Sequence, residues 1–136
     1  MITVGASDTN NTGWTSTDDT AAPWSAFGYT LDGFSKPDLG APGRSLVGPV
    51  PPLSTMPLEH PERVTSSGYM WMSGTSFSAP IVSGAAALIL AKNPSWTPDK
   101  VKGALMLTAR PTAATSMSLG VGELNAKGCL RCDEPA

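Results

Sequence analysis

Ser76 is the residue in this chain best placed to act as a nucleophile. It lies in Gly-Thr-Ser, directly before a long apolar run that predicts a helix. Gly74 allows a close backbone approach, Thr75 is a typical helix N-cap, and Pro80 is tolerated near a first helical turn. The helix should therefore begin beside Ser76, where unpaired N–H groups and the positive end of the helix dipole would stabilise an oxyanion.

The same stretch also fits a buried helix with a polar first turn, because Ser and Thr are common N-caps. The longer string favours the catalytic interpretation. From Gly74 it reads Gly-Thr-Ser-Phe-Ser-Ala-Pro-Ile-Val-Ser-Gly-Ala-Ala-Ala-Leu, which closely resembles the nucleophile segment of the subtilisin-like serine proteases, the subtilases. The resemblance implies that Ser76 is the nucleophile and that its backbone N–H forms half of an oxyanion hole. Ile81 stands where many members carry a histidine that is not a triad residue.

Residues 69–73, Tyr-Met-Trp-Met-Ser, predict a strand that leads into this segment. Core packing by Trp71 and by Met70 or Met72 is expected for one face of this strand, and the other face should lie beside Ser76. The family resemblance implies that the residues just before the nucleophile line the primed side of the substrate cleft. Met72 and Ser73, followed by Gly74 and Thr75, are therefore the candidate substrate-binding residues.

The resemblance extends over residues 1–126. Residues 1–6 predict a strand that ends in Val-Gly-Ala, and the loop that follows is rich in Thr, Asp, Asn, Gly and Ser. A second helix is predicted from Thr97 as N-cap to about Ala109, before Pro111. Other family-like segments are Trp-Ser-Ala-Phe-Gly at 24–28, Lys-Pro-Asp with Ala-Pro-Gly at 36–43, and Gly-Val-Gly-Glu-Leu-Asn-Ala at 120–126.

In subtilases the catalytic aspartate and histidine and the oxyanion-hole asparagine precede the strand that residues 1–6 resemble. We therefore expect the C-terminal part of a three-layer α/β domain with a parallel sheet, over residues 1–126, and a tail with Cys-x-x-Cys over 127–136. The implied function is that of a serine endopeptidase acting on peptide or protein substrates. The isolated chain is predicted to be inactive, because the base and its orienting carboxylate are not among these residues.

His60 is the only histidine and therefore the only alternative base within the chain. It lies in residues 44–68, which we interpret as a proline-interrupted loop. The sequence His-Pro-Glu lacks the Gly-Thr that follows the base in subtilases. His60 is therefore interpreted as a surface residue, and Asp32-Gly33 as a turn.

Composition and charge argue against binding to nucleic acid and against a membrane-bound protein. The 136 residues are 40% hydrophobic and 15% charged, which suits one globular domain. A net charge of −2 gives no basic surface for nucleic acid or an anionic membrane. The longest apolar run is shorter than the roughly 20 residues of a transmembrane helix, and residues 1–8 do not resemble a signal peptide. A full-length family member would be expected to be extracellular, but localisation cannot be read from this chain.

Metal and redox sites receive little support. Asp8, Asp18 and Asp19 could offer oxygen ligands to calcium, but without EF-hand spacing a solvated acidic loop is favoured. No cofactor is therefore predicted. Cys129 and Cys132 supply half of a four-ligand zinc site, so we expect a local disulfide or free thiols.

Two alternatives to an incomplete protease remain. The chain could be a binding or regulatory module that keeps the subtilase scaffold, or a subunit that pairs with a separate chain carrying the missing aspartate and histidine. A parallel sheet cut through its middle also exposes a strand edge and apolar surface. We therefore expect the isolated chain to be poorly soluble or oligomeric.

Overall fold

The computed structural model describes residues 1–12, 17–66, 68–114 and 117–131. A parallel strand pair lies at the centre of the body: β1 (Val4–Asp8) runs beside β5 (Leu39–Pro42), and β2 (Thr20–Ala21) pairs antiparallel with the end of β1. A separate hairpin is formed by β3 (Gly28–Tyr29) and β4 (Ser35–Lys36). The fold of these residues is mixed α/β.

The first strand differs from its predicted bounds. Residues 1–6 were expected to form it, with Gly5 at its end, but β1 begins at Val4 and continues through Gly5 to Asp8. A side chain at Gly5 would collide with the backbone carbonyl of Ser118, so this glycine serves close packing rather than a turn. Thr3 lies before the strand because its backbone N–H is held by the Asp38 side chain instead.

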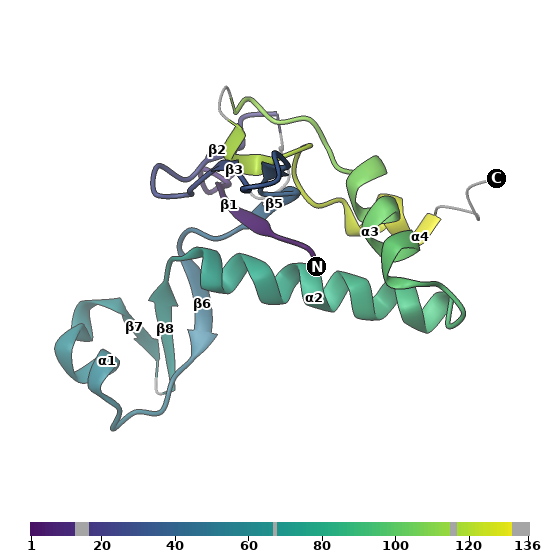
Figure 1. The fold of residues 1–136 in the computed structure, drawn as a ribbon. Coiled ribbons are helices and arrows are strands. Elements are labelled where there is room, and N and C mark those ends of the chain that lie inside the picture. The colour runs from purple at the N-terminus through teal and green to yellow at the C-terminus, as the bar shows by residue number, and fades with distance from the viewer. Residues whose placement is uncertain (13–16, 67, 115–116, 132–136) are drawn as a thin grey trace.

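Helix α2 (Thr75–Lys92) crosses the parallel pair, and α3 (Pro98–Leu107) and α4 (Ala126–Arg131) pack at its far end (Figure 1). The prediction of α3 is confirmed at its start, where the Thr97 side chain accepts a hydrogen bond from the Lys100 N–H at 3.3 Å. The helix ends two residues early, at Leu107, because Thr108 turns its hydroxyl back onto the Ala104 carbonyl at 2.8 Å.

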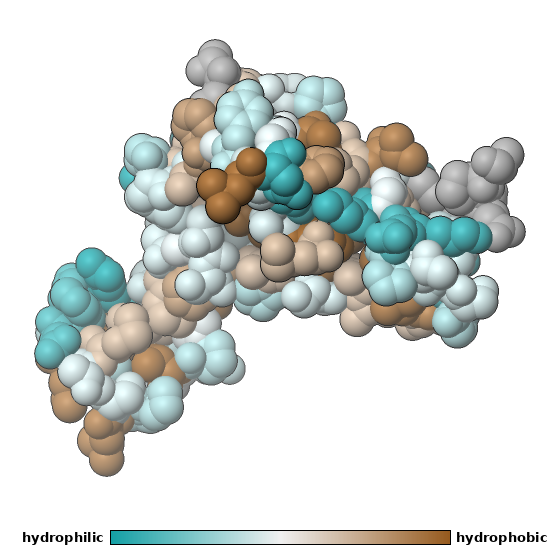
Figure 2. Space-filling model, viewed as in Figure 1, coloured by the Kyte–Doolittle hydropathy of each residue, from teal (hydrophilic) through white to brown (hydrophobic). Residues whose placement is uncertain are grey.

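A second, antiparallel sheet forms an arm that projects from the body near the start of α2 (Figure 1). Its strands lie in the order β6 (Leu46–Pro49), β8 (Tyr69–Met72), β7 (Val64–Ser66). The connection from β6 to β7 contains α1 (Thr55–Glu59) and the 3₁₀ helix η1 (Pro61–Arg63). Figure 2 shows hydrophobic residues on the outer surface of this arm.

The arm corrects the expectation of an irregular loop over residues 44–68. Its prolines occupy positions that regular structure tolerates: Pro49 ends an edge strand and Pro61 opens a 3₁₀ helix. The strand predicted at 69–73 is confirmed as β8, but Trp71 is not in the core. Trp71 is 45% exposed, whereas Met70 on the opposite face is fully buried.

Helix α4 starts at Ala126 and includes the first residues of the segment expected to be a tail. The domain boundary itself stays a prediction. Cys129 is 1% exposed within the core cluster, and its Sγ lies 2.6 Å from the Thr108 hydroxyl. Cys132 lies outside the described residues. The 3₁₀ helix η2 (Met117–Leu119) packs against β1 and β5.

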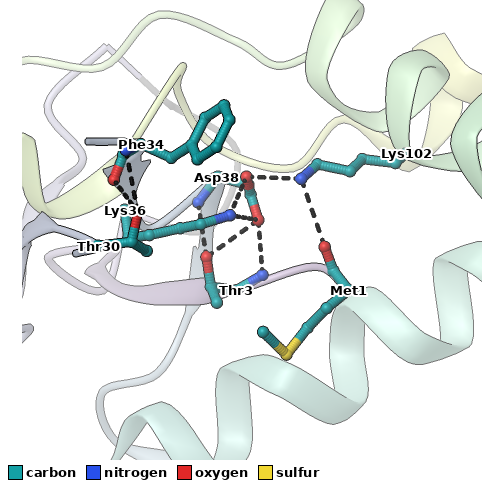
Figure 3. Close-up of polar contacts among 7 residues, drawn as sticks. All are labelled: Met1, Thr3, Thr30, Phe34, Lys36, Asp38 and Lys102. Atoms are coloured by element: carbon teal, nitrogen blue, oxygen red, sulfur yellow. Dashed lines mark hydrogen bonds and ion pairs between the residues drawn. The ribbon is translucent and has the colours of Figure 1, made fainter. Parts of the chain in front are cut away.

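Asp38 fastens three segments together (Figure 3). Its carboxylate receives Lys36 Nζ at 2.8 Å, Lys102 Nζ at 2.8 Å, and both the N–H and hydroxyl of Thr3. The Lys102 ammonium also donates to the Met1 carbonyl at 3.3 Å, so α3 and the first residues of the chain share this site. Burial alone would raise the pKa of Asp38, but the hydrogen bonds from Lys102, Lys36 and Thr3 outweigh it and hold the pKa well below its usual range.

We expect Asp38→Asn to lower the free energy of unfolding by about 2 to 3 kcal/mol near neutral pH, because two ammonium groups lose a 6% exposed partner. The wild-type chain should also lose stability as the pH falls below about 4, since a carboxylate whose pKa is depressed by folding stabilises only when ionised. Urea unfolding at several pH values measures both effects.

Asp99→Asn is the matched control, because this exposed carboxylate lies in the first turn of α3 and contributes at most about 0.5 kcal/mol through the helix dipole. Equal losses from the two substitutions would contradict the role given to Asp38.

Candidate active site

Ser76 lies in the first turn of α2 with its side chain exposed. The helix begins one residue earlier than expected, so Gly74 rather than Thr75 is the N-cap, and no side chain caps the helix. Within the described residues the backbone N–H groups of Thr75 and Ser76 find no acceptor, while Phe77 N–H bonds to the Gly74 carbonyl at 3.0 Å. Unpaired donors beside an exposed hydroxyl are what an oxyanion site requires.

Pro80 lies further into the helix than predicted. It is the sixth residue of α2 rather than part of the first turn. A proline has no N–H to donate to the carbonyl four residues earlier, which here belongs to Ser76. The backbone at Ser76 is thus freed from the helical ladder on its carbonyl side as well as at its N–H.

The start of α2 is held against the ends of the two parallel strands. Gly74 N–H donates to the Gly43 carbonyl at 2.8 Å, and Gly43 N–H donates in turn to the Ser7 carbonyl at 3.0 Å. Ser78, which is fully buried, donates its hydroxyl to the Pro42 carbonyl at 3.1 Å. These bonds fix the position of Ser76 relative to β1 and β5.

The four candidate substrate-binding residues form one continuous segment from the end of β8 to Ser76. Met72 is half-buried, and Ser73 is exposed with its hydroxyl accepting the Ser45 N–H at 2.9 Å. Gly74 is the N-cap, and Thr75 is exposed at the first helical position. Contact with a substrate remains a prediction for all four.

Thr75 also borders a surface hollow that the sequence did not reveal. The hollow lies between the β3–β4 hairpin and β1, and its other lining residues include Thr3, Val4, Trp24, Phe27, Tyr29 and Lys36. The aromatic residues at 24–29 were visible in the sequence, but their distance from residue 75 along the chain hid the association. Trp24 is 43% exposed beside this hollow.

His60 is not brought to Ser76. It follows α1 in the part of the arm away from α2 (Figure 1), and its Nδ1 lies 3.3 Å from Glu62 Oε1. Its side chain is 44% exposed, in keeping with the surface position expected for it. No described residue forms a hydrogen bond with the Ser76 hydroxyl.

The three aspartates considered as calcium ligands have different surroundings. Asp8 forms an ion pair with Arg44, Asp18 accepts the Thr12 hydroxyl at 3.2 Å, and Asp19 is buried. Across the ranges that the structure describes, no three His, Cys, Asp or Glu side chains gather as metal ligands would.

Gly43 lies where the start of α2 packs closely against the ends of β1 and β5. A Cβ at Gly43 would overlap the Ser78 hydroxyl and lie 2.6 Å from the Ala6 Cβ and 3.2 Å from the Gly74 carbonyl. We expect Gly43→Ala to lower the free energy of unfolding by about 2 to 3 kcal/mol through overpacking, which chemical denaturation would measure. It should also displace the first turn of α2, visible as faster amide exchange at Gly74.

Gly103→Ala in α3 provides the control, because nothing lies within 4 Å of its added Cβ. Alanine should stabilise that helix by about 0.5 to 1 kcal/mol. If the two substitutions behaved alike, the close approach at Gly43 would not be the constraint we describe.

Comparison with known proteins gives a consistent result. The sequence profile described as the subtilase family matches residues 1–122. The chain is 47% identical over 102 residues to serine protease AprX of Bacillus subtilis, covering 75% of this chain and 23% of that protein. It is 32% identical over 112 residues to the subtilisin-like protease SBT3 of Solanum lycopersicum, covering 72% of this chain and 15% of that one.

Among solved structures, fervidolysin from Fervidobacterium pennivorans superposes with a TM-score of 0.70 at 24% identity, over 99% of this chain and 19% of fervidolysin. That likeness concerns the fold. The chain therefore spans less than a quarter of each of these three proteins. With the family profile covering most of its length, and with homologues that are subtilisin-like proteases, the chain belongs to the subtilase family.

Proposed function

We propose that this chain is the nucleophile-bearing part of a serine endopeptidase domain and that Ser76 attacks the carbonyl carbon of a peptide bond. The observation that supports this most directly is the exposed Ser76 hydroxyl in the first turn of α2, beside backbone N–H groups without acceptors. Membership of the subtilase family supplies the reaction class.

Each step of the reaction has a donor or acceptor. A histidine from the rest of the domain takes the Ser76 proton as the Oγ–carbon bond forms, and an aspartate orients that histidine. The tetrahedral oxyanion accepts the Ser76 N–H and an asparagine amide from the rest of the domain. The histidine then protonates the leaving amine, and water hydrolyses the acyl-enzyme.

The segment ahead of Ser76 would guide the substrate. Met72, Ser73, Gly74 and Thr75 run from the arm to the helix start, so a peptide bound across Ser76 would pass along them. The arm carries exposed apolar side chains on the same strand, Tyr69 and Trp71. These features suit an extended polypeptide substrate better than a small molecule.

The outer face of α2 suits a further protein layer. The helix buries four residues on one stripe, Ser78, Val82, Ala85 and Ile89, and exposes apolar residues around the remainder, including Ile81 and Leu88. Its length and composition would also suit a membrane span, a test that the core helix of a soluble domain passes as well. A helix that is apolar all round belongs in an interior.

The side of β1 that faces the short strand β2 also suits a further layer. Gly43 N–H bonds to the Ser7 carbonyl on the β5 side, whereas Ala6 is bonded on the opposite side by Ala22 and Ser25. Strand β2 pairs only with Ser7 and Asp8, so within the described ranges no strand lies beside Val4 on that opposite side, although β5 pairs with Val4 on the other. A further parallel strand and helices from the rest of the domain would complete a three-layer α/β fold around β1 and α2.

A fluorophosphonate probe tests the nucleophile. We expect the isolated chain to show essentially no labelling, because loss of the base costs such a site on the order of a million-fold in rate. Mixing with a polypeptide that carries the aspartate and histidine regions of the same peptidase domain should restore labelling. Ser76→Ala should abolish it, whereas Ser83→Ala, an exposed serine further along α2, should not.

Each contrary outcome has a distinct meaning. Labelling of the lone chain that disappears in Ser76→Ala would place a base within the chain, and His60→Ala would then identify it. Assembly without labelling would contradict the peptidase proposal and favour a binding or regulatory module on the same scaffold.

Leu88→Glu tests the exposed face of α2. The isolated wild-type chain should sediment as oligomers, and this substitution should shift it toward monomer because Leu88 is 55% exposed in an apolar surface. The same change should weaken association with the rest of the domain about 100-fold or more, since it would bury an unpaired carboxylate. Analytical ultracentrifugation and titration calorimetry measure the two effects.

Leu107→Glu is the control, because Leu107 is 81% exposed at the end of α3, away from the outer face of α2. A wild-type chain that is a monodisperse monomer with cooperative melting would contradict the missing layer.

A further inference from the structure

Two buried carboxyl groups meet where distant parts of the chain converge. Glu123 is 1% exposed and Asp19 is 4% exposed. The Ser7 hydroxyl of β1 donates to Glu123 Oε1, and the Asp19 side chain lies within hydrogen-bond reach of Glu123. The three residues come from β1, from the position directly before β2, and from the segment between α3 and α4.

Each carboxyl retains an unsatisfied oxygen. Glu123 Oε2 and Asp19 Oδ1 are both buried and receive no donor from the described residues. A buried acceptor without a donor is costly, and two adjacent carboxylates also repel each other. A single proton on one carboxyl removes both penalties, because a protonated carboxyl becomes a donor to its neighbour.

We propose that Glu123 is protonated in the folded chain and donates a hydrogen bond to Asp19, forming a pH-sensitive latch that fastens residues 120–125 to β1 and to the segment before β2. The latch is closed while Glu123 is protonated and loosens when Glu123 ionises. The latch is independent of peptidase activity, because all of its groups lie within the chain.

The charged surroundings set where the latch titrates. Burial raises the pKa of Glu123 from 4.5 to about 7, with the Asp19 carboxyl adding to the rise. The Ser7 hydroxyl and the exposed Arg110 guanidinium act in the opposite direction. The other ionisable group of β1, Asp8, is paired with Arg44, and the Asp38 carboxylate beside β5 is occupied by Lys36 and Lys102.

The latch lies within a network of main-chain bonds. Glu123 exchanges both backbone hydrogen bonds with Arg110 at 2.8 Å, and Leu124 N–H donates to Gly40 at 2.8 Å. The Asp19 carbonyl accepts Ala113 N–H at 3.2 Å. When the latch loosens, these amides should exchange faster with solvent.

The direction of the pH effect follows from proton uptake. Between pH 4.5 and about 7 the folded chain holds a proton that the unfolded chain has lost, so stability falls as the pH rises through this window and levels off above it. The pKa difference corresponds to a change of up to about 300-fold in the folding equilibrium.

Unfolding of the 136-residue chain should therefore be followed by urea titration from about pH 5 to about pH 8. We expect the wild type to lose stability over this range. In Glu123→Gln, whose amide donates at every pH, the folding equilibrium constant should change by a factor at least tenfold smaller. Glu59→Gln on the exposed surface of α1 is the matched control and should keep the wild-type dependence. Wild-type pH dependence in Glu123→Gln would overturn the proposal.

Two measurements on the wild type keep the test independent of the variant's folding. Infrared spectroscopy at pH 6 should show a buried protonated carboxyl, and the amides of Arg110, Ala113, Glu123 and Leu124 should lose protection at pH 8 relative to those of α3. A missing carboxyl band would overturn the protonated state of Glu123. Recovery of stability at pH 8 on adding calcium alone would show a cation site instead, which would also overturn it.

Discussion

The close approach at Gly43 is the constraint on which the rest of the structure depends. The start of α2 can reach the ends of β1 and β5 only because no Cβ separates Gly43 from Ala6, Ser78 and the Gly74 carbonyl. That contact lets the Gly74 N–H reach Gly43 and the Ser78 hydroxyl reach Pro42. Ser76 is consequently positioned by main-chain bonds to the sheet rather than by a side-chain cap. A first helical turn held in this way keeps its N–H groups available for a ligand.

The same helix explains why the chain exposes an apolar surface. A helix with one polar face can lie at the protein surface, but α2 is apolar on nearly all sides and buries only one stripe. Its exposed leucines, and the part of β1 that the two-residue strand β2 does not reach, lie on surfaces that the rest of a subtilase domain could cover. The presentation of Ser76 and the uncovered apolar surface are thus two features of one element. The helix that presents the hydroxyl is also the helix with the apolar outer face.

Local signals predicted the elements near Ser76 well, because capping residues and apolar runs act within a few positions. The start of α2 was displaced by only one residue, and Thr97 was identified as the cap of α3. The arm was missed because its regular structure depends on pairing between β6 and β8, which proline counting cannot detect. Trp71 was assigned to the core because alternation gives two faces but does not say which one is covered. The Ser7–Glu123 contact spans 116 positions and leaves no local pattern at all.

Two buried carboxyls in this small fold have opposite surroundings, and the contrast limits the conditions in which the chain is stable. Asp38 is met by two ammonium groups, which favour its ionised form, whereas Glu123 is met by another carboxyl in a drier site, which favours its protonated form. The first interaction weakens as the pH falls and the second weakens as the pH rises. Both join the first eight residues of the chain to segments that follow α2, so they act on the same part of the fold from opposite sides of the pH scale. This part of the fold should therefore be tightest in mildly acidic solution, between the titration of Asp38 and that of Glu123.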